Sequence, residues 1–399
     1  MVVRPGYKRT EVGLIPEEWD ISTLQEACRA PITYGIVQCG PQVGSGIPYV
    51  RVSDMEKPEL DVDGMLRTSP AIAARFPRST LQHGDIVYAL RGKLGEVRQV
   101  SSSVVGANLT QGTARLSPKE GLLSDYFVWG MRSPHVLRQA EIASKGTTFR
   151  EITLADLRSV CLAIPPRPEQ RDIAAALNDV DALLGGLDRL IAKKRGLKRA
   201  AMQQLLTGKT RLPGFQGEWK SKKFSDLLRY ERPDKCLVKS SDYEECGDTP
   251  VLTANKSFFL GYTNENVGIY ESLPVIIFDD FTTDSKYVEF PFKVKSSAIK
   301  ILRSRKAGVN LWFVAERMRL VRFPVGEHKR YYISEYQHVE LPTPDPEEQC
   351  DIAAALADMD AELAALQARR DKTHDLKQAM MQELLTGKTR LVPAVAAHA

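Results

Sequence analysis

The chain has 399 residues, of which 55 are Lys or Arg and 50 are Asp or Glu, and this length suits two or three domains. An apolar share of 43% and a net charge of +5 exclude a disordered chain and a polycationic, histone-like chain, and no apolar run approaches the roughly 18–20 residues of a membrane span. The N-terminus lacks an apolar signal segment, and six Cys without a CxxC pair predict reduced thiols in a cytosolic protein.

The first variable region, residues 20–163, predicts a mixed domain of strands and short helices. Short apolar runs punctuated by Gly and Pro, such as residues 47–52 and 85–90, indicate strands. Helices are expected at residues 123–132 and 134–142. Together with the N-terminal residues, this region is predicted to form one domain over residues 1–163.

Polar loops that contain glycine are the candidate binding residues of this domain. Arg51 and Asp54 follow one predicted strand, and Arg91 and Lys93 follow another in the run Arg-Gly-Lys-Leu-Gly. Glycine lets the backbone approach a bulky anionic partner, while Arg and Lys side chains reach phosphates or guanine edges. An ordinary hairpin turn is the alternative for the second run. Three further candidates lie in similar loops: Tyr34, Lys145 and Thr147.

The sequence of residues 169–212 is repeated at 348–391, at a constant offset of 179 with 27 of 44 positions identical. In each copy apolar residues alternate at spacings of four and three, which places them on one face of a helix. Each copy follows a Pro-rich segment and ends near Gly208 or Gly387, so each is predicted to be a helix of about 38 residues, about 55–60 Å long.

We expect the two helices to pack on each other, because a lone rod with one apolar stripe is poorly stable. Two separate helices, each capping its own domain, are the alternative. The predicted seam of the helix pair consists of Ile173, Leu177, Val180, Leu184, Leu187, Ile191, Ile352, Leu356, Met359, Leu363 and Leu366.

The second variable region, residues 220–341, again shows strand signals, at 273–278 and 298–302. Both halves open on a Glu-Trp pair, at Trp19 and Trp219, but we find no other residue-level match between the two regions. The sequence therefore predicts a central helix over residues 164–212, a second domain over 213–343 and a distal helix over 344–399.

A basic and aromatic stripe lies in this second domain, between residues 286 and 306. Seven basic residues occur there against one acid, with three aromatic residues among them, and such a stripe suits phosphate contact. A solvated edge strand protected by Lys is the alternative. The candidate contact residues of the second domain are Asn255, Lys256, Thr282, Thr283, Lys286, Lys293 and Lys300.

Motifs for catalysis or for a cofactor are missing from the sequence. Gly208-Lys209-Thr210 resembles the end of a P-loop, but the required earlier glycine is Gln203, and the run closes a predicted helix instead of opening one. There is no G-x-G-x-x-G, no Asn-Pro-Pro-aromatic or Asp-Pro-Pro-aromatic motif, and no metal-ligand spacing among the six His. We therefore predict a chain that is not an enzyme and holds no cofactor or metal.

The order of domain, Pro-rich hinge, long helix ending Leu-Leu-Thr-Gly-Lys-Thr-Arg-Leu, and then the same again resembles the specificity subunit of type I restriction-modification systems. The matching runs include residues 165–170, residues 211–215 with Glu218-Trp219, residues 84–95 and residues 276–288. Cys350 departs from the family pattern, which has a basic residue at that place.

The resemblance implies an α+β fold, in which two mixed α/β target recognition domains are separated by a pair of long antiparallel helices in a pseudo-two-fold repeat. It implies double-stranded DNA as the ligand, with each domain reading one half of a bipartite site and the half-sites about one turn, roughly 34–36 Å, apart. A coiled-coil scaffold, or a DNA-binding adaptor of another defence system, stays the alternative.

The resemblance also implies partner subunits that perform the chemistry. Two modification subunits would carry S-adenosylmethionine and methylate adenine N6, and restriction subunits would use ATP and magnesium. It implies a location in the cytoplasm of a bacterium or archaeon, associated with the nucleoid.

Overall fold

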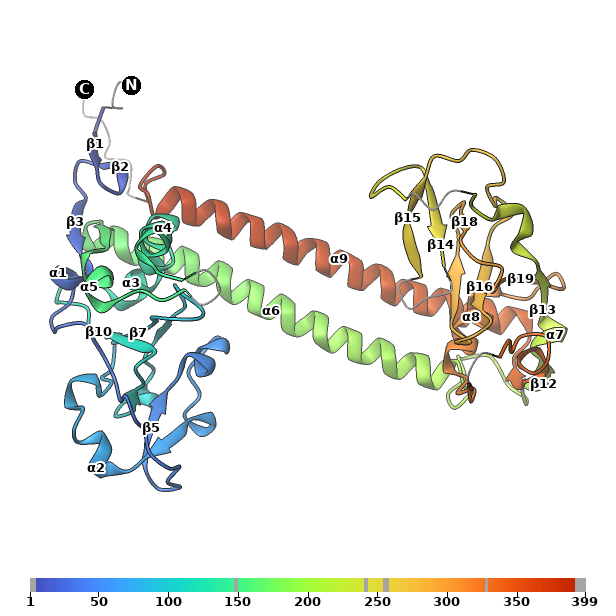
Figure 1. The fold of residues 1–399 in the computed structure, drawn as a ribbon, viewed down its shortest axis with the longest axis horizontal. Coiled ribbons are helices and arrows are strands. Elements are labelled where there is room, and N and C mark those ends of the chain that lie inside the picture. The colour runs from blue at the N-terminus through green and yellow to red at the C-terminus, as the bar shows by residue number, and fades with distance from the viewer. Residues whose placement is uncertain (1–4, 147–149, 240–242, 254–257, 327–328, 392–399) are drawn as a thin grey trace. The chain divides into compact units, whose positions relative to one another are not determined.

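A computed structural model describes residues 5–146, 150–239, 243–253, 258–326 and 329–391 of the chain (Figure 1). The chain forms two compact units: the first combines residues 1–188 with 369–399, and the second is residues 189–368. Each unit contains one mixed α+β domain and one end of each of two long helices, α6 (Arg167–Leu205) and α9 (Pro346–Leu384). The prediction of mixed domains and two long helices is thus confirmed.

Domain 1 (residues 7–164) is built on two small sheets. The four-stranded antiparallel sheet has the order β4 (Thr33–Tyr34), β10 (Thr113–Leu116), β7 (Ile86–Ala89), β8 (Val97–Gln99). The three-stranded sheet has the order β6 (Leu66–Thr68), β5 (Ile47–Val50), β9 (Asn108–Leu109), and its pair β5–β9 is parallel.

Further elements of domain 1 close the ends of these sheets. The remaining strands are the hairpin β1 (Tyr7–Thr10) and β2 (Gly13–Pro16), and the antiparallel pair β3 (Asp20–Thr23) and β11 (Cys161–Ile164). The helices are α1 (Leu24–Ala27), α2 (Pro70–Ala73), α3 (Ser124–Met131), α4 (Pro134–Ala143) and α5 (Leu154–Ser159). The helices α3 and α4 agree with the ranges expected from the sequence to within one residue at each end.

Domain 2 (residues 220–343) has the same plan. Its four-stranded antiparallel sheet has the order β13 (Leu228–Glu231), β19 (Ile299–Ser304), β16 (Val275–Asp279), β17 (Ser285–Val288). Its three-stranded sheet has the order β15 (Phe259–Thr263), β14 (Thr249–Leu252), β18 (Lys293–Val294), again with one parallel pair, β14–β18. The other elements are β12 (Lys220–Lys223) paired with β20 (Glu340–Thr343), and the helices α7 (Phe224–Leu227) and α8 (Leu311–Leu320).

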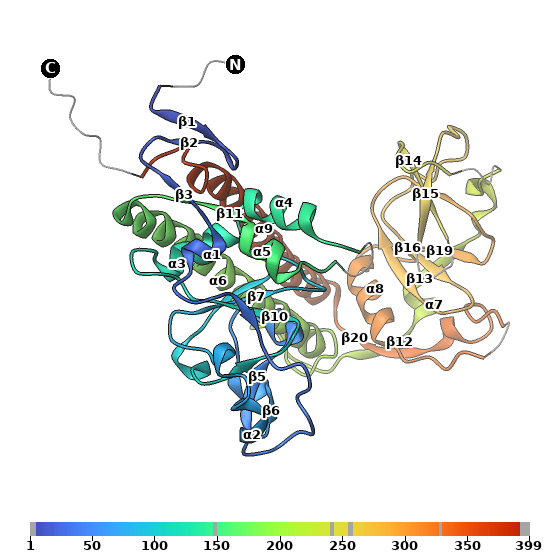
Figure 2. The same cartoon turned by 60° about the vertical axis from the view of Figure 1, so that its left-hand side comes forward.

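The two domains therefore share a topology that their sequences do not reveal. In chain order β5, β7, β8, β9 and β10 of domain 1 match β14, β16, β17, β18 and β19 of domain 2, because each set has the same neighbours and the same strand directions. In both domains the four-stranded sheet lies between the three-stranded sheet and the long helices (Figures 1 and 2). A loop in one domain thus has a definite counterpart in the other.

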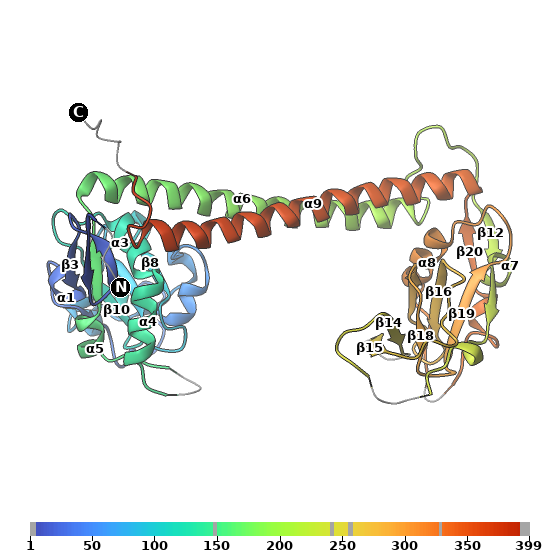
Figure 3. The same cartoon turned by 90° about the horizontal axis from the view of Figure 1, so that it is seen from above.

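The helices α6 and α9 run side by side in opposite directions within each unit, as Figure 3 shows. Ion pairs fix this direction: in the first unit Asp181 pairs with Lys377 and Asp188 with Arg370, and in the second Lys194 pairs with Glu362 and Lys198 with Asp360. Glycine ends each helix segment as predicted, since Gly208 and Gly387 both have positive φ angles, of 70° and 68°.

The ends of the long helices are part of the domain cores. Ile173 and Leu177 of α6, together with Leu384 of α9, are buried in the main core of domain 1. Ile352 and Leu356 of α9 are buried in the corresponding core of domain 2. Each domain therefore rests on the start of one long helix, and burial of these side chains links the domain's stability to that helix.

Candidate nucleic-acid interface

Several of the candidate residues selected from the two variable regions fall on matching loops of the two domains. Arg51 follows β5, and in the sequence Asn255 and Lys256 come shortly after the matching strand β14. Arg91 and Lys93 lie in the turn between β7 and β8, whose counterpart between β16 and β17 holds Thr282 and Thr283. The selections at the β7–β8 and β16–β17 turns therefore lie at the same end of corresponding four-stranded sheets. Asn255, Lys256 and Thr147 lie outside the described residues.

Arg51 is held in place by Asp54. The two side chains form a double hydrogen bond, with Arg51 Nη2 donating to Asp54 Oδ1 at 2.7 Å and Arg51 Nε donating to Asp54 Oδ2 at 3.1 Å. The Asp54 carboxylate also accepts from the Arg51 backbone N–H at 2.8 Å, and this pairing raises the pKa of Arg51. Since 37% of the Arg51 side chain is exposed but only 11% of Asp54, the geometry presents the guanidinium and makes Asp54 its support.

Arg98 on β8 supports this loop from within, a role that no sequence pattern indicated. Its side chain is buried and donates to the carbonyl oxygens of Met55 and Lys57, the latter at 2.7 Å from Nε. It also forms an ion pair with Glu96 at 2.7 Å. The loop after β5 is therefore fixed by a cation that is itself inaccessible to a ligand.

Four cationic residues of domain 1 gather around the β7–β8 turn. The backbones of Arg91 and Lys145 both bridge to Glu151, and the Gly92 N–H donates to the Arg150 carbonyl at 3.1 Å. Arg91, Lys93, Lys145 and Arg150 are all exposed, and Lys93 forms a solvent-exposed ion pair with Glu56 at 3.1 Å. Arg150 was not selected from the sequence, because it is distant in the chain from the Arg-Gly-Lys run and is brought there by backbone pairing.

The Arg91 side chain lies close to Gly112. A Cβ on Gly112 would lie 2.9 Å from Arg91 Nε, so the Arg91 side chain lies against the turn that leads into β10. Tyr34 belongs to the neighbouring edge strand β4 and is 39% exposed. The structure thus brings Tyr34, Arg51, Arg91, Lys93 and Lys145 to one region of domain 1.

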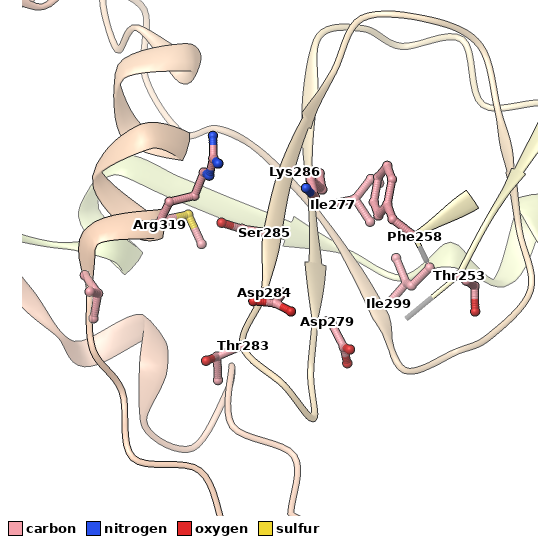
Figure 4. A pocket seen from close by; sticks show the side chains of 12 residues that line it. Thr253, Phe258, Ile277, Asp279, Thr283, Asp284, Ser285, Lys286, Ile299 and Arg319 are labelled. Atoms are coloured by element: carbon pink, nitrogen blue, oxygen red, sulfur yellow. The ribbon is translucent and has the colours of Figure 1, made fainter. Parts of the chain in front are cut away.

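The matching region of domain 2 has a different chemistry. Thr282 Oγ1 donates to Asp279 Oδ2 at 2.7 Å, and Thr283 adopts a left-handed φ of 61° in the turn. Lys286 on β17 is exposed, with Nζ 5.9 Å from the centroid of the Phe258 ring. A cavity of about 300 Å³ surrounds this end of β17, and Figure 4 shows Lys286 beside Phe258 and Thr283 beyond the end of the strand.

Two of the predicted contact residues of domain 2 are buried in ion pairs. Lys293 is 2% exposed, with Nζ 3.0 Å from Glu265 Oε2, and Lys300 is 5% exposed, with Nζ 3.2 Å from Asp280 Oδ2. Lys300 lies on the central strand β19, so the basic stripe is not a solvated edge strand there. These two side chains are bound to carboxylates inside the domain and have little surface to offer a phosphate.

The predicted helix seam is buried to different depths. Eight of its members are buried, and Val180, Met359 and Leu366 are half-buried. Ile173, Leu177, Ile352 and Leu356 belong to the domain cores, whereas Leu184, Leu187, Ile191 and Leu363 are buried outside these core clusters. The α6 side chains Leu183, Leu190 and Leu197, which lie outside the seam, are between 38% and 49% exposed.

A Trp–Glu–Arg cluster occurs at the start of each long helix. In the first unit Trp19 Nε1 donates to Glu169 Oε2 at 2.9 Å, and Arg390 donates to both carboxylate oxygens, at 2.6 and 2.9 Å.

The second unit repeats the arrangement. Trp219 Nε1 donates to Glu348 Oε2 at 3.1 Å, and Arg211 Nη2 donates to the same oxygen at 2.7 Å. Sequence analysis did not single these clusters out, although both the Glu and the Arg are repeated at the offset of 179 and both Trp open their halves.

Metal ligation finds no support in the described part of the chain. Within it, no group of three or more His, Cys, Asp or Glu side chains is arranged to hold a metal ion. Gly208-Lys209-Thr210 follows the end of α6, as expected for a run that closes a helix, and a phosphate-binding loop needs the opposite order. No helix among the described residues is long and apolar enough to cross a membrane.

Comparison with known proteins points to one family. Residues 16–191 match the family model of the type I restriction modification DNA specificity domain. A specificity subunit of a type I restriction enzyme of Escherichia coli is 44% identical over 141 residues, which is 34% of each chain. A putative type I specificity subunit of Methanocaldococcus jannaschii is 21% identical over 426 residues, with 97% of both chains covered. Matches to the two first E. coli relatives span about a third and about half of their length, 34% and 52%.

Solved structures share the fold over nearly the whole chain. The HsdS subunit from Thermoanaerobacter tengcongensis is 17% identical with a TM-score of 0.52, covering 94% of this chain and 98% of that one. A structure described as underlying complex assembly and conformational transition of the type I R-M system is 17% identical with a TM-score of 0.60, covering 94% and 99%. The family model over residues 16–191 and the curated relatives make this chain similar in sequence to specificity subunits of type I restriction-modification systems, and the solved structures share its fold.

Proposed function

We propose that the chain is the DNA-reading subunit of a type I restriction-modification complex, in which each domain reads one half of a bipartite site. The observation that carries this proposal is the matching of loops: two domains of one topology present different side chains from the same end of the same sheet. Such a pair suits two different half-sites, because side chains at base edges specify sequence while phosphate contacts only position the protein.

Domain 1 has the chemistry for phosphate and guanine contact. Arg51 is held by its two hydrogen bonds to Asp54, and a guanidinium so oriented suits the two acceptors of a guanine edge. Arg91, Lys93, Lys145 and Arg150 supply positive charge around it, which suits the phosphate backbone.

Domain 2 would use Thr282, Thr283 and Lys286 at the corresponding turn. Asn255 and Lys256 stay candidates on the sequence alone. Lys293 and Lys300 are better assigned to the support of the domain, because each is already paired with a buried or half-buried carboxylate.

The long helices would set the spacer between the half-sites and dock two modification subunits. Catalysis, with S-adenosylmethionine, ATP and magnesium, would belong to the modification and restriction subunits, and this chain would bind no cofactor of its own. The exposed leucines of α6 and the charged faces of both helices leave surface for such partners.

Methylome sequencing tests the function directly. The chain would be produced with its modification subunit in a host that lacks adenine methylation, and also alone. We expect N6-methyladenine in both halves of one bipartite motif with the pair, and none with the chain alone. A continuous motif, no motif at all, or methylation by the chain alone would contradict the proposal.

A further inference from the structure

Phe281 is an exposed aromatic residue at the tip of the β16–β17 turn. Its side chain is 41% exposed, although a phenylalanine on a surface turn gains little for folding. The matching turn in domain 1, between β7 and β8, carries Arg91 and Lys93. The tip that is cationic in domain 1 is therefore apolar in domain 2.

The backbone on both sides of Phe281 is fixed by buried groups. The Phe281 N–H donates to Asp279 Oδ1 at 2.9 Å, and the Thr283 N–H donates to the Asp279 carbonyl at 2.9 Å. Asp280, which is 2% exposed, accepts from the N–H groups of Tyr331 and Tyr332 at 3.1 and 2.7 Å and pairs with Lys300. An aromatic side chain on such a fixed turn loses little conformational entropy when it binds a partner.

A cation lies against the ring. The Arg330 guanidinium lies over it, 5.8 Å from its centroid. Arg330 also lines a cavity of about 390 Å³ together with Arg232, Lys300, Asp234 and Asp280. An exposed apolar ring beside cations fits a partner that offers apolar atoms next to phosphates, as the thymine methyl group does in the major groove of DNA.

We propose that Phe281 is a specificity-determining residue that contacts the 5-methyl group of a thymine in the half-site read by domain 2, while Arg330 contacts a neighbouring phosphate. The proposal rests on the proposed function of the chain. Insertion of the ring between stacked bases is disfavoured, because it needs both ring faces and Arg330 occupies one of them. Phe281 thus contacts the base, and Arg330 contacts the phosphate.

The experiment uses the chain assembled with its modification subunits and a DNA duplex library randomised at both half-sites. Enriched sequences define the two half-sites of the parent complex. Each thymine of both half-sites is then replaced in turn by deoxyuridine, which lacks only the methyl group. We expect one thymine, in one half-site, whose replacement weakens binding about fourfold, as expected for one buried methyl group.

The variant Phe281→Ala should bind the thymine and deoxyuridine duplexes equally, so that the two changes are not additive. Phe290→Ala is the matched control, because Phe290 is 45% exposed and follows the other end of β17; it should keep the fourfold preference. Phe281→Tyr, which keeps the ring, should also retain it. Arg330→Gln should weaken binding to all duplexes alike and lower the salt dependence.

The outcomes separate this inference from the function on which it rests. If no bipartite sequence is enriched, the proposed function fails. If the parent complex selects a bipartite site but no thymine is sensitive to loss of its methyl group, the role of Phe281 is overturned, and this result needs no variant. Persistence of the thymine preference in Phe281→Ala would overturn it as well.

Discussion

Arg91 and Lys93 are exposed cations on the turn between β7 and β8, and both should contribute to DNA affinity through phosphate contact. We expect Arg91→Gln and Lys93→Gln each to weaken binding of the assembled complex and to lower the slope of log affinity against log salt by about one. Titration of a DNA duplex at several salt concentrations measures this slope.

Lys119→Gln is the matched control for these two variants. Lys119 is also exposed, but it follows the opposite end of β10, where its N–H donates to the carbonyl of Ala27 on α1. Its replacement should leave the slope unchanged. Equal effects of all three changes would show that net charge, and not the β7–β8 turn, governs binding.

Glu169 is a buried carboxylate whose partners are Trp19 and Arg390. Its replacement by Gln removes the buried counterion of Arg390 and leaves it only the exposed carboxylate of Glu18, so we expect the free energy of unfolding to fall by about 1–3 kcal/mol. Urea unfolding measures the change, and Glu218→Gln, at an exposed position, is the control. A fall no larger than that of the control would contradict a stabilising role for the cluster.

Two buried thiols predict a loss of stability in alkaline solution. Burial raises the pKa of both Cys28 and Cys236 to about 11, from the usual 9.0. Since the folded state holds these protons more tightly than the unfolded state, their contribution is complete below pH 9 and is lost as the pH rises from about 9 towards 11.

Urea unfolding between a pH of about 8 and about 10.5 tests this. The decline should be smaller for Cys28→Ala and for Cys236→Ala than for the parent, because each variant lacks one of the two buried thiols. Buried tyrosines contribute equally to the decline of the parent and of the variants. Cys246→Ala, at an exposed thiol, should behave as the parent. An identical decline in all four proteins would exclude the two buried thiols as its cause.

At the scale of elements, the long helices were predictable from the sequence, and the burial of two candidate contact residues, Lys293 and Lys300, was not. The four–three spacing in two copies gave α6 and α9 because a helical period over many turns has few alternative explanations. The role of Lys293 and Lys300 could not be read from the same sequence. A basic residue on a strand points either to solvent or to a buried acid, depending on which face of its sheet is covered by other elements. Here those elements include β14, β18 and α8, which come from distant parts of the chain.

The matching of the two domains was also beyond the sequence. Only the Glu-Trp openings are alike in sequence, yet the strand orders agree. A strand order is fixed by which apolar faces meet, and many side chains satisfy it. The loops at the strand ends are free of that requirement, so Arg91 in one domain and Phe281 in the other can stand on equivalent turns.

The helix pair should behave as a ruler, with its length setting the spacer. One heptad inserted in α6 after Arg195 and one in α9 near Leu363 would keep the apolar face in register and lengthen both helices by about 10 Å, or about three base pairs. We expect the methylated motif to keep both half-sites and gain spacer. An unchanged spacer in an active complex would sink this role, and a single-residue insertion, which turns the apolar face away, should instead destabilise the protein.

At the scale of the whole molecule, the two domains should be exchangeable readers. Residues 220–341 run from the first residue of β12 into β20, and these two strands pair with each other, so a replacement segment from another specificity subunit begins and ends on neighbouring strands. The core contacts that it must reproduce include those with Ile352 and Leu356 of α9 and with Leu206 directly after α6. A segment with apolar residues there should fold on the helices without further change.

Exchange of this segment should therefore replace one half-site of the methylated motif and leave the other half-site and the spacer as they were. The reciprocal exchange of residues 20–163 should replace the other half-site alone. Methylome sequencing reads both outcomes in one experiment. A change in both half-sites, or in neither, would mean that the two domains do not read their half-sites independently. The matching loops would then reflect only the shared packing of the two domains.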